Sequence, residues 1–192
     1  AIKNQLLRNL VQRRKEKGMV GRPIRVMIVG IPNVGKSSFI NRMAKSKRTK
    51  VEDRPGVTRT KQWVSLGESV EMLDMPGVLW PKFEDQSVAL NLAFTGAIKD
   101  DVIDIESVSM KLLEALSGKY PKLLVERYKI EIDNGDDGKV LLEKVGRKRG
   151  MLLPGGIVNT ERAAITVLDE FRCAKLGRIS LEFPPSGDSN EE

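Results

Sequence analysis

Residues 30–37 read GIPNVGKS and match the pattern G-x-x-x-x-G-K-[ST] at every fixed position. An apolar, β-branched run at 24–29 precedes the stretch, and a helical pattern at 36–44 follows it. This order of strand, glycine-rich loop and helix is typical of a phosphate-binding loop, whose backbone N–H groups and following helix N-terminus face an anion. The alternative is a glycine-rich turn with no ligand. The stretch predicts an α/β fold built around a P-loop.

Two side chains of this loop suit the phosphates of a nucleotide. Lys36 is placed to reach the β- and γ-phosphates, and Ser37 offers its hydroxyl to Mg²⁺. Thr58, in the basic stretch RPGVTRT, lies between this loop and the next predicted strand, where its hydroxyl can close on the same ion. The alternative is a loop Thr without a ligand. The sequence therefore predicts Mg²⁺ as a cofactor.

A second motif lies in LDMPGVLWP, residues 73–81, where Asp74 and Gly77 form D-x-x-G. In P-loop hydrolases such an Asp can hold a metal-bound water, and the Gly N–H can touch the γ-phosphate. The alternative for Asp74 is an Asp that begins a turn. Together with Thr58, these two residues predict a switch that senses the γ-phosphate.

Val78 follows this glycine, at the position where a Gln commonly orients the attacking water. An aliphatic side chain cannot hydrogen-bond a water molecule. The chain contains no His, so a His base or a His-ligated metal within this chain is excluded. The sequence therefore leaves the catalytic residue unknown. We expect slow hydrolysis that a partner or a bound cation stimulates.

Positive charge is concentrated at the start of the chain. The net charge is +7, and residues 1–25 hold eight Lys or Arg and one Glu, so the remaining residues balance to zero. This distribution favours an arm that faces a polyanion, with a solvated helix face as the alternative. A second candidate basic patch, again with solvated surface as the alternative, consists of Lys144, Arg147, Lys148 and Arg149.

Hydrophobic periodicity divides the chain into four regions. We predict a basic helix and linker at 1–22, an α/β domain at 23–103, a small all-helical domain at 104–183 and a disordered tail at 184–192. Beyond the P-loop, the α/β domain has hairpin strands at 63–66 and 69–73 and a helix at 87–98. The helical domain has helical patterns at 107–116, 122–128, 138–145 and 160–175. Asn159 is the predicted N-cap of the last helix, and Gly177 follows its end as the C′ residue.

The composition also indicates the cellular compartment in which the protein is expected. No apolar run approaches the ~18 residues of a membrane span, and Cys173 is the one cysteine. A single thiol cannot form an internal disulfide, which favours a reducing cytoplasm. We therefore expect a cytoplasmic, monomeric protein without a membrane span.

Five stretches together resemble the ribosome biogenesis GTPase A (YlqF/RbgA) family of circularly permuted GTPases: GIPNVGKSSFINRMAKSK, DRPGVTRTKQWVSLG, LDMPGVLWPKFED, LAFTGAIKD and GRISLE. In that family the guanine-specificity motif precedes the P-loop, and a helical C-terminal domain follows the G domain. No Asn-Lys-x-Asp motif occurs in residues 78–192, and the chain begins with Ala1. The resemblance therefore implies a partial GTPase domain from which the upstream, guanine-reading segment is missing.

The same resemblance implies a set of ligands. It implies that GTP and GDP bind through Asn33, Val34, Gly35, Lys36, Ser37, Ser38 and Gly77. It places Mg²⁺ at Ser37 and Thr58. Asn33 resembles the P-loop Asn that helps coordinate K⁺ in potassium-stimulated GTPases, while a loop residue bonded to its own backbone is the alternative. A hydrophobic residue at Val78 is expected in this family.

The implied role is a partner-activated GTPase in late assembly of the large ribosomal subunit, with the basic arm and the helical domain facing rRNA. Two other functions stay open. A P-loop ATPase or kinase is weakened by Thr58 and the D-x-x-G motif. An RNA-binding scaffold with a vestigial nucleotide site explains the charge but leaves the phosphate motifs without a purpose.

Overall fold

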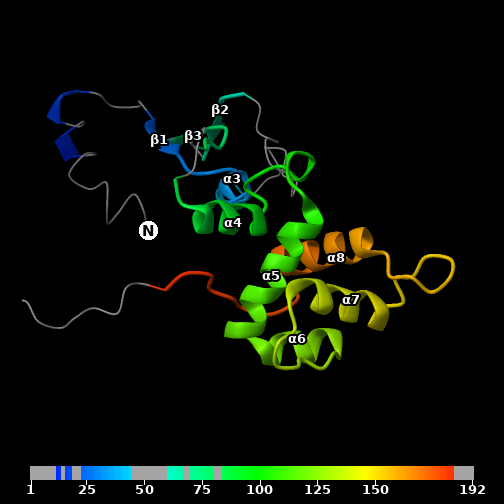
Figure 1. Cartoon of the computed structure of the whole chain (residues 1–192). Coiled ribbons are helices and arrows are strands. Elements are labelled where there is room, and N and C mark those ends of the chain that lie inside the picture. Colours follow the sequence, from blue (N-terminus) through cyan, green and yellow to red (C-terminus); the bar gives the residue numbers. More distant parts are fainter. Residues whose placement is uncertain are drawn as a thin grey trace, which may run out of the picture. The chain divides into compact units, whose positions relative to one another are not determined.

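The computed structural model describes residues 12–13, 16–18, 23–44, 60–66, 70–79 and 84–183. The chain divides into two compact units, Ala1–Leu79 and Trp80–Glu192. Figure 1 shows the sheet elements of the first and the helices of the second. We refer to them as the sheet unit and the helical unit. No described helix is long and apolar enough to cross a membrane.

The sheet unit is built on three strands, β1 (Ile24–Ile28), β2 (Gln62–Ser65) and β3 (Val70–Asp74), in the order β1-β3-β2. β1 pairs with β3 in parallel, and β2 pairs with β3 antiparallel. One helix, α3 (Lys36–Met43), packs on the sheet, where a small core forms from Ile40, Val64 and Met72. The predicted strand at 24–29, helix at 36–44 and hairpin strands are confirmed. The residues between the two hairpin strands, 67–69, and the basic stretch RPGVTRT, except its last residue, lie outside the described residues.

The register of β1 and β3 determines where the two sequence motifs meet. Ile28, the last residue of β1, pairs with Asp74, the last residue of β3. Parallel strands end at the same edge of a sheet. The P-loop, which leaves β1, and the D-x-x-G loop, which leaves β3, therefore begin side by side.

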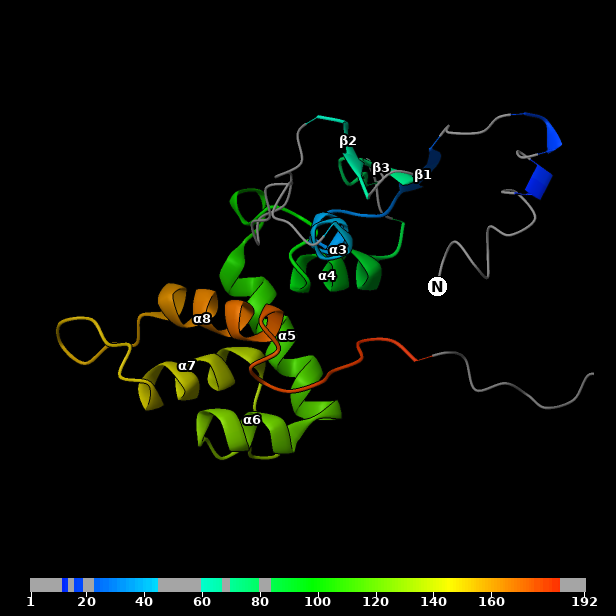
Figure 2. The same ribbon diagram turned by 180° about the vertical axis from the view of Figure 1, so that it is seen from behind.

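The helical unit contains α4 (Gln86–Phe94), the short 3-10 helix η1 (Asp100–Val102), α5 (Ile105–Lys119), α6 (Pro121–Tyr128), α7 (Gly138–Lys148) and α8 (Thr160–Arg172). α5 packs against each of the four other α-helices, and Figures 1 and 2 show it running through the bundle. Leu112, Leu116, Leu142 and Val167 are among the fully buried side chains of its core. The helical patterns predicted at 107–116, 122–128 and 138–145 are confirmed and lie within the longer helices α5, α6 and α7. The helix predicted at 87–98 is confirmed as α4, but it ends earlier, at Phe94.

Carboxylate and amide side chains begin four of these helices. Asp85, Asp104, Asp137 and Asn159 each accept a hydrogen bond from a backbone N–H of the first turn. Such caps satisfy N–H groups that have no partner within the helix. Asn159, which accepts from the N–H of Arg162 at 2.9 Å, is the cap that the sequence predicts.

The predicted end of the last helix is wrong. α8 ends at Arg172 rather than at residue 175, and Ala174, with φ 54°, takes the left-handed position expected of Gly177. The N–H of Ala174 donates to the Phe171 carbonyl and the N–H of Lys175 to the Glu170 carbonyl, each at 2.9 Å. These two bonds are those of a Schellman motif, which closes the helix before the glycine is reached.

The compact units divide between Leu79 and Trp80, earlier than the domain boundary predicted between residues 103 and 104. The difference comes from α4, which packs against α5 and α8. Arg172 of α8 reinforces this packing, since its guanidinium donates to the carbonyls of Ala93 and Phe94 and to Asp100. The four predicted domains remain predictions, and the tail at 184–192 and most of 1–22 lie outside the described residues.

Candidate nucleotide-binding site

The P-loop joins β1 to α3 through two residues of left-handed backbone. Asn33 has φ 58° and Gly35 has φ 86°. Gly35 is also the N-cap of α3 and has no side chain to cap it. Its carbonyl accepts from the Phe39 N–H at 2.8 Å, which begins the helix. A side chain at Gly35 would meet no neighbour, so the glycine is required by the backbone conformation.

Lys36 folds back over the loop that precedes it. Its ammonium group donates to the Ile31 carbonyl at 2.7 Å. Partial burial lowers the pKa of Lys36 from its usual value, and the carboxylate of Asp74 offsets part of that change. The Lys36 ammonium group therefore lies at the opening of the loop. An anionic ligand bound there would stabilise its charged form.

Ser37 and Asp74 connect the two motifs. The Ser37 hydroxyl lies 2.8 Å from the Asp74 Oδ2 and donates a hydrogen bond to it. Asp74 is fully buried, and its Oδ1 has no hydrogen-bond partner within the described residues. A buried carboxylate oxygen without a partner is costly unless a further group satisfies it.

This donor set fits Mg²⁺. The ion prefers oxygen ligands and is usually held by one or two protein groups, waters and substrate phosphates. Ser37 and Asp74 offer a hydroxyl and a carboxylate at one edge of the sheet. The described residues contain no cluster of three or more His, Cys, Asp or Glu that could hold a metal. A nucleotide's own phosphates would complete the ligand set here.

Gly77 lies against the P-loop backbone. A Cβ atom built on Gly77 would fall 2.4 Å from the Pro32 nitrogen and 2.5 Å from its Cα. Real side chains do not approach so closely, so only glycine permits this crossing. The D-x-x-G loop is therefore held next to the phosphate-binding loop. Val78, the next residue, is 72% exposed and offers no polar side-chain atom.

The structure brings together four of the residues predicted from sequence: Lys36, Ser37, Asp74 and Gly77. Asn33 and Val34 lie in the loop, and Ser38 lies in the first turn of α3. Thr58 lies outside the described residues. Two contact residues were missed, Ile31 and Pro32, because they occupy variable positions of the motif and act through backbone atoms.

The second predicted basic patch is only partly available to a ligand. Lys144 is paired with Asp133 and Asp136 at 2.7 and 2.6 Å. Arg149 lies 3.2 Å from Glu170 and stacks over the Tyr128 ring. Internal partners therefore neutralise two of the four cations.

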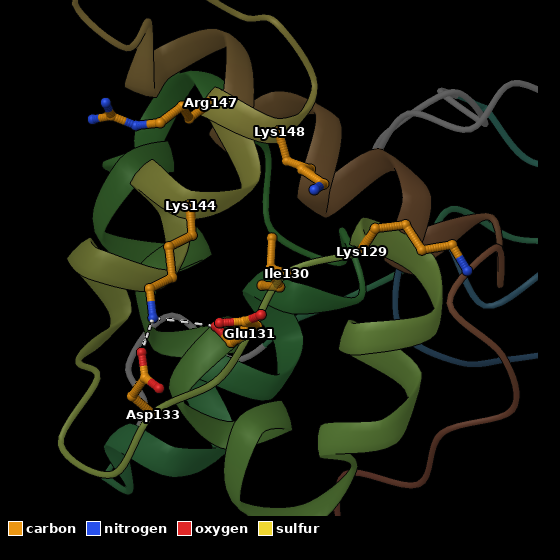
Figure 3. A pocket seen from close by; sticks show the side chains of 7 residues that line it. All are labelled: Lys129, Ile130, Glu131, Asp133, Lys144, Arg147 and Lys148. Carbon is orange, nitrogen blue, oxygen red and sulfur yellow. Dashed lines mark hydrogen bonds and ion pairs between the residues drawn. The ribbon is translucent and has the colours of Figure 1, made fainter.

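The other two cations of this patch, Arg147 and Lys148, form no ion pair in the described part of the chain. They line a pocket of about 370 Å³ together with Lys129, Ile130, Glu131, Asp133 and Lys144. Figure 3 shows that Arg147 and Lys129 point away from each other. The cations do not converge on one point, so the pocket lacks the arrangement of a phosphate site.

Comparison with known proteins identifies the family of this chain. The model of a family described as "50S ribosome-binding GTPase" matches residues 25–126, just over half of the chain. The chain belongs to this GTPase family. The match includes the P-loop, the D-x-x-G motif and the helices from α4 to most of α6.

Ribosome biogenesis GTPase A of Bacillus pumilus is 44% identical to this chain over 182 residues, which are 95% of the chain and 64% of that protein. The protein of the same name from Bacillus licheniformis is 45% identical, over 94% of the chain and 63% of that protein. The predicted resemblance to the ribosome biogenesis GTPase A family is confirmed. The chain spans less than two thirds of the length of these relatives.

Among solved structures, the GDP-bound structure of TM YlqF has a TM-score of 0.58 and 29% identity, and the match covers 90% of this chain and 66% of that one. The GNP-bound YlqF from T. maritima has a TM-score of 0.56 and 26% identity, covering 93% and 66%. The described fold is therefore YlqF-like and contains a P-loop GTPase domain of α/β type.

Proposed function

We propose that this protein binds and hydrolyses GTP and acts as an assembly factor for the large ribosomal subunit. The observation that carries the proposal is the meeting of the P-loop with the D-x-x-G loop. Ser37 bonds Asp74 at 2.8 Å, and Gly77 lies against the backbone of Pro32. A γ-phosphate bound in the P-loop would contact both loops. The D-x-x-G loop would therefore respond to whether the γ-phosphate is present.

Each residue of the site then has a role. Lys36 neutralises the β- and γ-phosphates, and the P-loop backbone from Asn33 to Ser38 binds them. Ser37 and Thr58 would hold Mg²⁺, with Asp74 acting through water, and the ion would neutralise phosphate charge. The Gly77 N–H senses the γ-phosphate. Support for these roles comes from the Ser37–Asp74 contact and the unsatisfied Asp74 oxygen.

Guanine recognition belongs to a segment that precedes the P-loop, in a circularly permuted order. The support is that residues 78–192 carry no Asn-Lys-x-Asp motif. In the same arrangement, a helical C-terminal domain follows the GTPase domain. The packing of helices α4 to α8 around one core supports this second part.

Hydrolysis is slow in the isolated protein and is stimulated by the ribosomal partner. The support is Val78, which is exposed and has no group that could orient water. A monovalent K⁺ held beside the phosphates by Asn33 is a second source of stabilisation for the developing charge. The protein acts as a cytoplasmic monomer, and its basic surfaces face rRNA.

The test titrates labelled GTP and ATP against the intact protein and its Lys36→Ala variant. We expect GTP to bind, ATP to bind weakly, and the variant to bind neither. Survival of nucleotide affinity in the variant would remove the P-loop assignment. Tight binding of ATP would favour an ATPase, and binding of neither nucleotide by the wild type would favour an RNA-binding scaffold.

The second half of the test measures hydrolysis with and without large subunits, in K⁺ and in Na⁺. We expect turnover to rise with subunits and to be higher in K⁺. Binding of subunits is compared with GTP, with GDP and with a non-hydrolysable analogue. We expect the GTP form to bind best, and equal affinity in all three states would refute the proposed cycle.

A further inference from the structure

A small hairpin, residues 151–159, joins α7 to α8 in the helical unit. Leu152 and Val158 face each other across it. Two backbone hydrogen bonds flank this pair, from Leu153 to Ile157 at 2.7 Å and from Asn159 to Met151 at 2.8 Å. Figures 1 and 2 both show the segment extending beyond the ends of the two helices. We call residues 151–159 the apolar hairpin.

The base of the apolar hairpin is anchored in the core. Met151 and Val158 are buried. Gly146 of α7 makes room for Val158, because a Cβ built there would lie 2.4 Å from a Val158 methyl group. The turn uses Gly155 and Gly156, with φ +88° and +79°. The segment is therefore held in one conformation before any partner binds, which lowers the entropic cost of binding.

The tip of the apolar hairpin exposes aliphatic side chains. Leu152 and Leu153 are each 46% exposed, and Ile157 is 66% exposed. Elsewhere in residues 84–183 the exposed large hydrophobic residues stand singly along the chain. Scattered exposed apolar residues are ordinary, whereas a group of them on an ordered projection indicates an interaction site.

The chemistry of the tip distinguishes between kinds of partner. Residues 151–159 contain no charged and no aromatic side chain, in a chain of which 31% is charged. RNA-binding surfaces use cations for phosphates and aromatic rings for bases. Aliphatic side chains on an ordered turn instead suit an apolar pocket of a protein, where they are removed from water. Arg147 and Lys148, at the end of α7 and separated from the hairpin by two residues, form no ion pair within the described residues and favour carboxylates at the rim of that pocket.

We propose that the apolar hairpin inserts into an apolar, acid-rimmed pocket on a protein component of the large ribosomal subunit. This inference rests on the proposed function, since it assumes that the subunit is the partner. It assigns protein contact to the tip of the hairpin and leaves RNA contact to basic surfaces elsewhere in the chain.

The test replaces Leu153 and Ile157 together by Ser in the intact protein. Both side chains are about half exposed or more, so we expect the melting temperature and the GTP affinity to stay unchanged. Affinity for purified large subunits should fall at least about tenfold. Affinity for protein-free rRNA extracted from the same subunits should not change. The matched control, Val125→Ser with Ile165→Ser, removes two exposed aliphatic side chains of α6 and α8 and should bind subunits like the wild type.

A photoreactive phenylalanine analogue at Ile157 gives a second measurement, which does not depend on affinity. We expect it to cross-link to a protein of the subunit. Unchanged subunit affinity in the hairpin variant, an equal loss on protein-free rRNA, or a cross-link to RNA would each overturn the proposal. Failure of the wild type to bind either GTP or subunits would instead refute the proposed function, so the two failures are distinguishable.

Discussion

At the scale of single residues, Gly77 shows how tightly the D-x-x-G loop lies against the P-loop. A Cβ at this position would lie 2.4 Å from the Pro32 nitrogen and 2.8 Å from the Ile31 carbonyl carbon. The atoms in the way belong to the backbone of the P-loop, which cannot rotate aside as a flexible side chain could. The two loops must therefore separate if residue 77 gains a side chain.

We predict that Gly77→Ala lowers the free energy of unfolding of the sheet unit by about 1–3 kcal/mol, as overpacking does. It should also lower the affinity for GTP more than the affinity for GDP, because the proposed contact with the γ-phosphate depends on the position of this loop. Thermal melting and nucleotide titration check the two effects. The control is Gly118→Ala in α5, where no neighbour lies within 4 Å. There, alanine should raise stability by up to about 1 kcal/mol. Equal effects of the two substitutions would contradict the assignment of a close contact.

Lys36 gives a prediction for pH. Burial lowers the pKa of Lys36 in the folded protein below its ordinary value of 10.5. Between the lowered pKa and 10.5, the unfolded chain holds a proton that the folded protein has lost. The stability of the nucleotide-free protein therefore rises with pH in that window and is independent of this group at lower pH. Lys36→Met should lack the rise, as measured by urea unfolding of both proteins between pH 7 and pH 10. Parallel curves would contradict the burial of this charge.

Much of the candidate site could be predicted from the sequence, because the P-loop and D-x-x-G motifs specify side chains at fixed spacings. Ser37 and Asp74 belong to that set, and they lie within hydrogen-bond distance. The Ile31 carbonyl that accepts from Lys36 could not be predicted. A backbone acceptor depends on the path of the loop, and any residue could occupy that position.

At the scale of elements, the sequence predicts where helices begin better than where they end. Asn159 was correctly predicted as an N-cap because a short polar side chain can bond the free N–H groups of the first turn. The end of α8 was misplaced because the rule looks for glycine in the left-handed position. Here Ala174 adopts φ 54°. The two Schellman bonds around it stabilise a conformation that alanine alone disfavours.

This helix end gives a third prediction. Ala174→Gly should raise the free energy of unfolding by about 1 kcal/mol, because glycine adopts the left-handed conformation without the Cβ penalty. Chemical denaturation of the helical unit measures the change. The matched control is Ala115→Gly inside α5, which should lower stability by about 1 kcal/mol, since there the backbone is helical. A loss of stability at both positions would show that Ala174 is not left-handed.

At the scale of the whole molecule, the two units differ in the size of their cores. In the described part of the sheet unit, three hydrophobic side chains form the buried cluster. The helical unit buries a cluster that draws on every α-helix from α4 to α8. Apolar burial is the main stabilising contribution to folding. The helical unit has far more of it than the described part of the sheet unit. The residues proposed to bind the nucleotide, by contrast, lie before the division at Leu79.

The last prediction combines these two facts. In hydrogen exchange of the intact, nucleotide-free protein, the amides of β1, β2 and β3 should exchange faster than those of α5, α7 and α8, because local opening costs less where few apolar contacts are lost. GTP with Mg²⁺ should slow exchange in the sheet unit by mass action on its folded state and leave α6 and α7 unchanged. The Lys36→Ala variant serves as the control, since it should show the same difference between units but no response to GTP. Equal exchange in the two units would contradict the difference in cores. Slowing confined to the helical unit would contradict the location of the site.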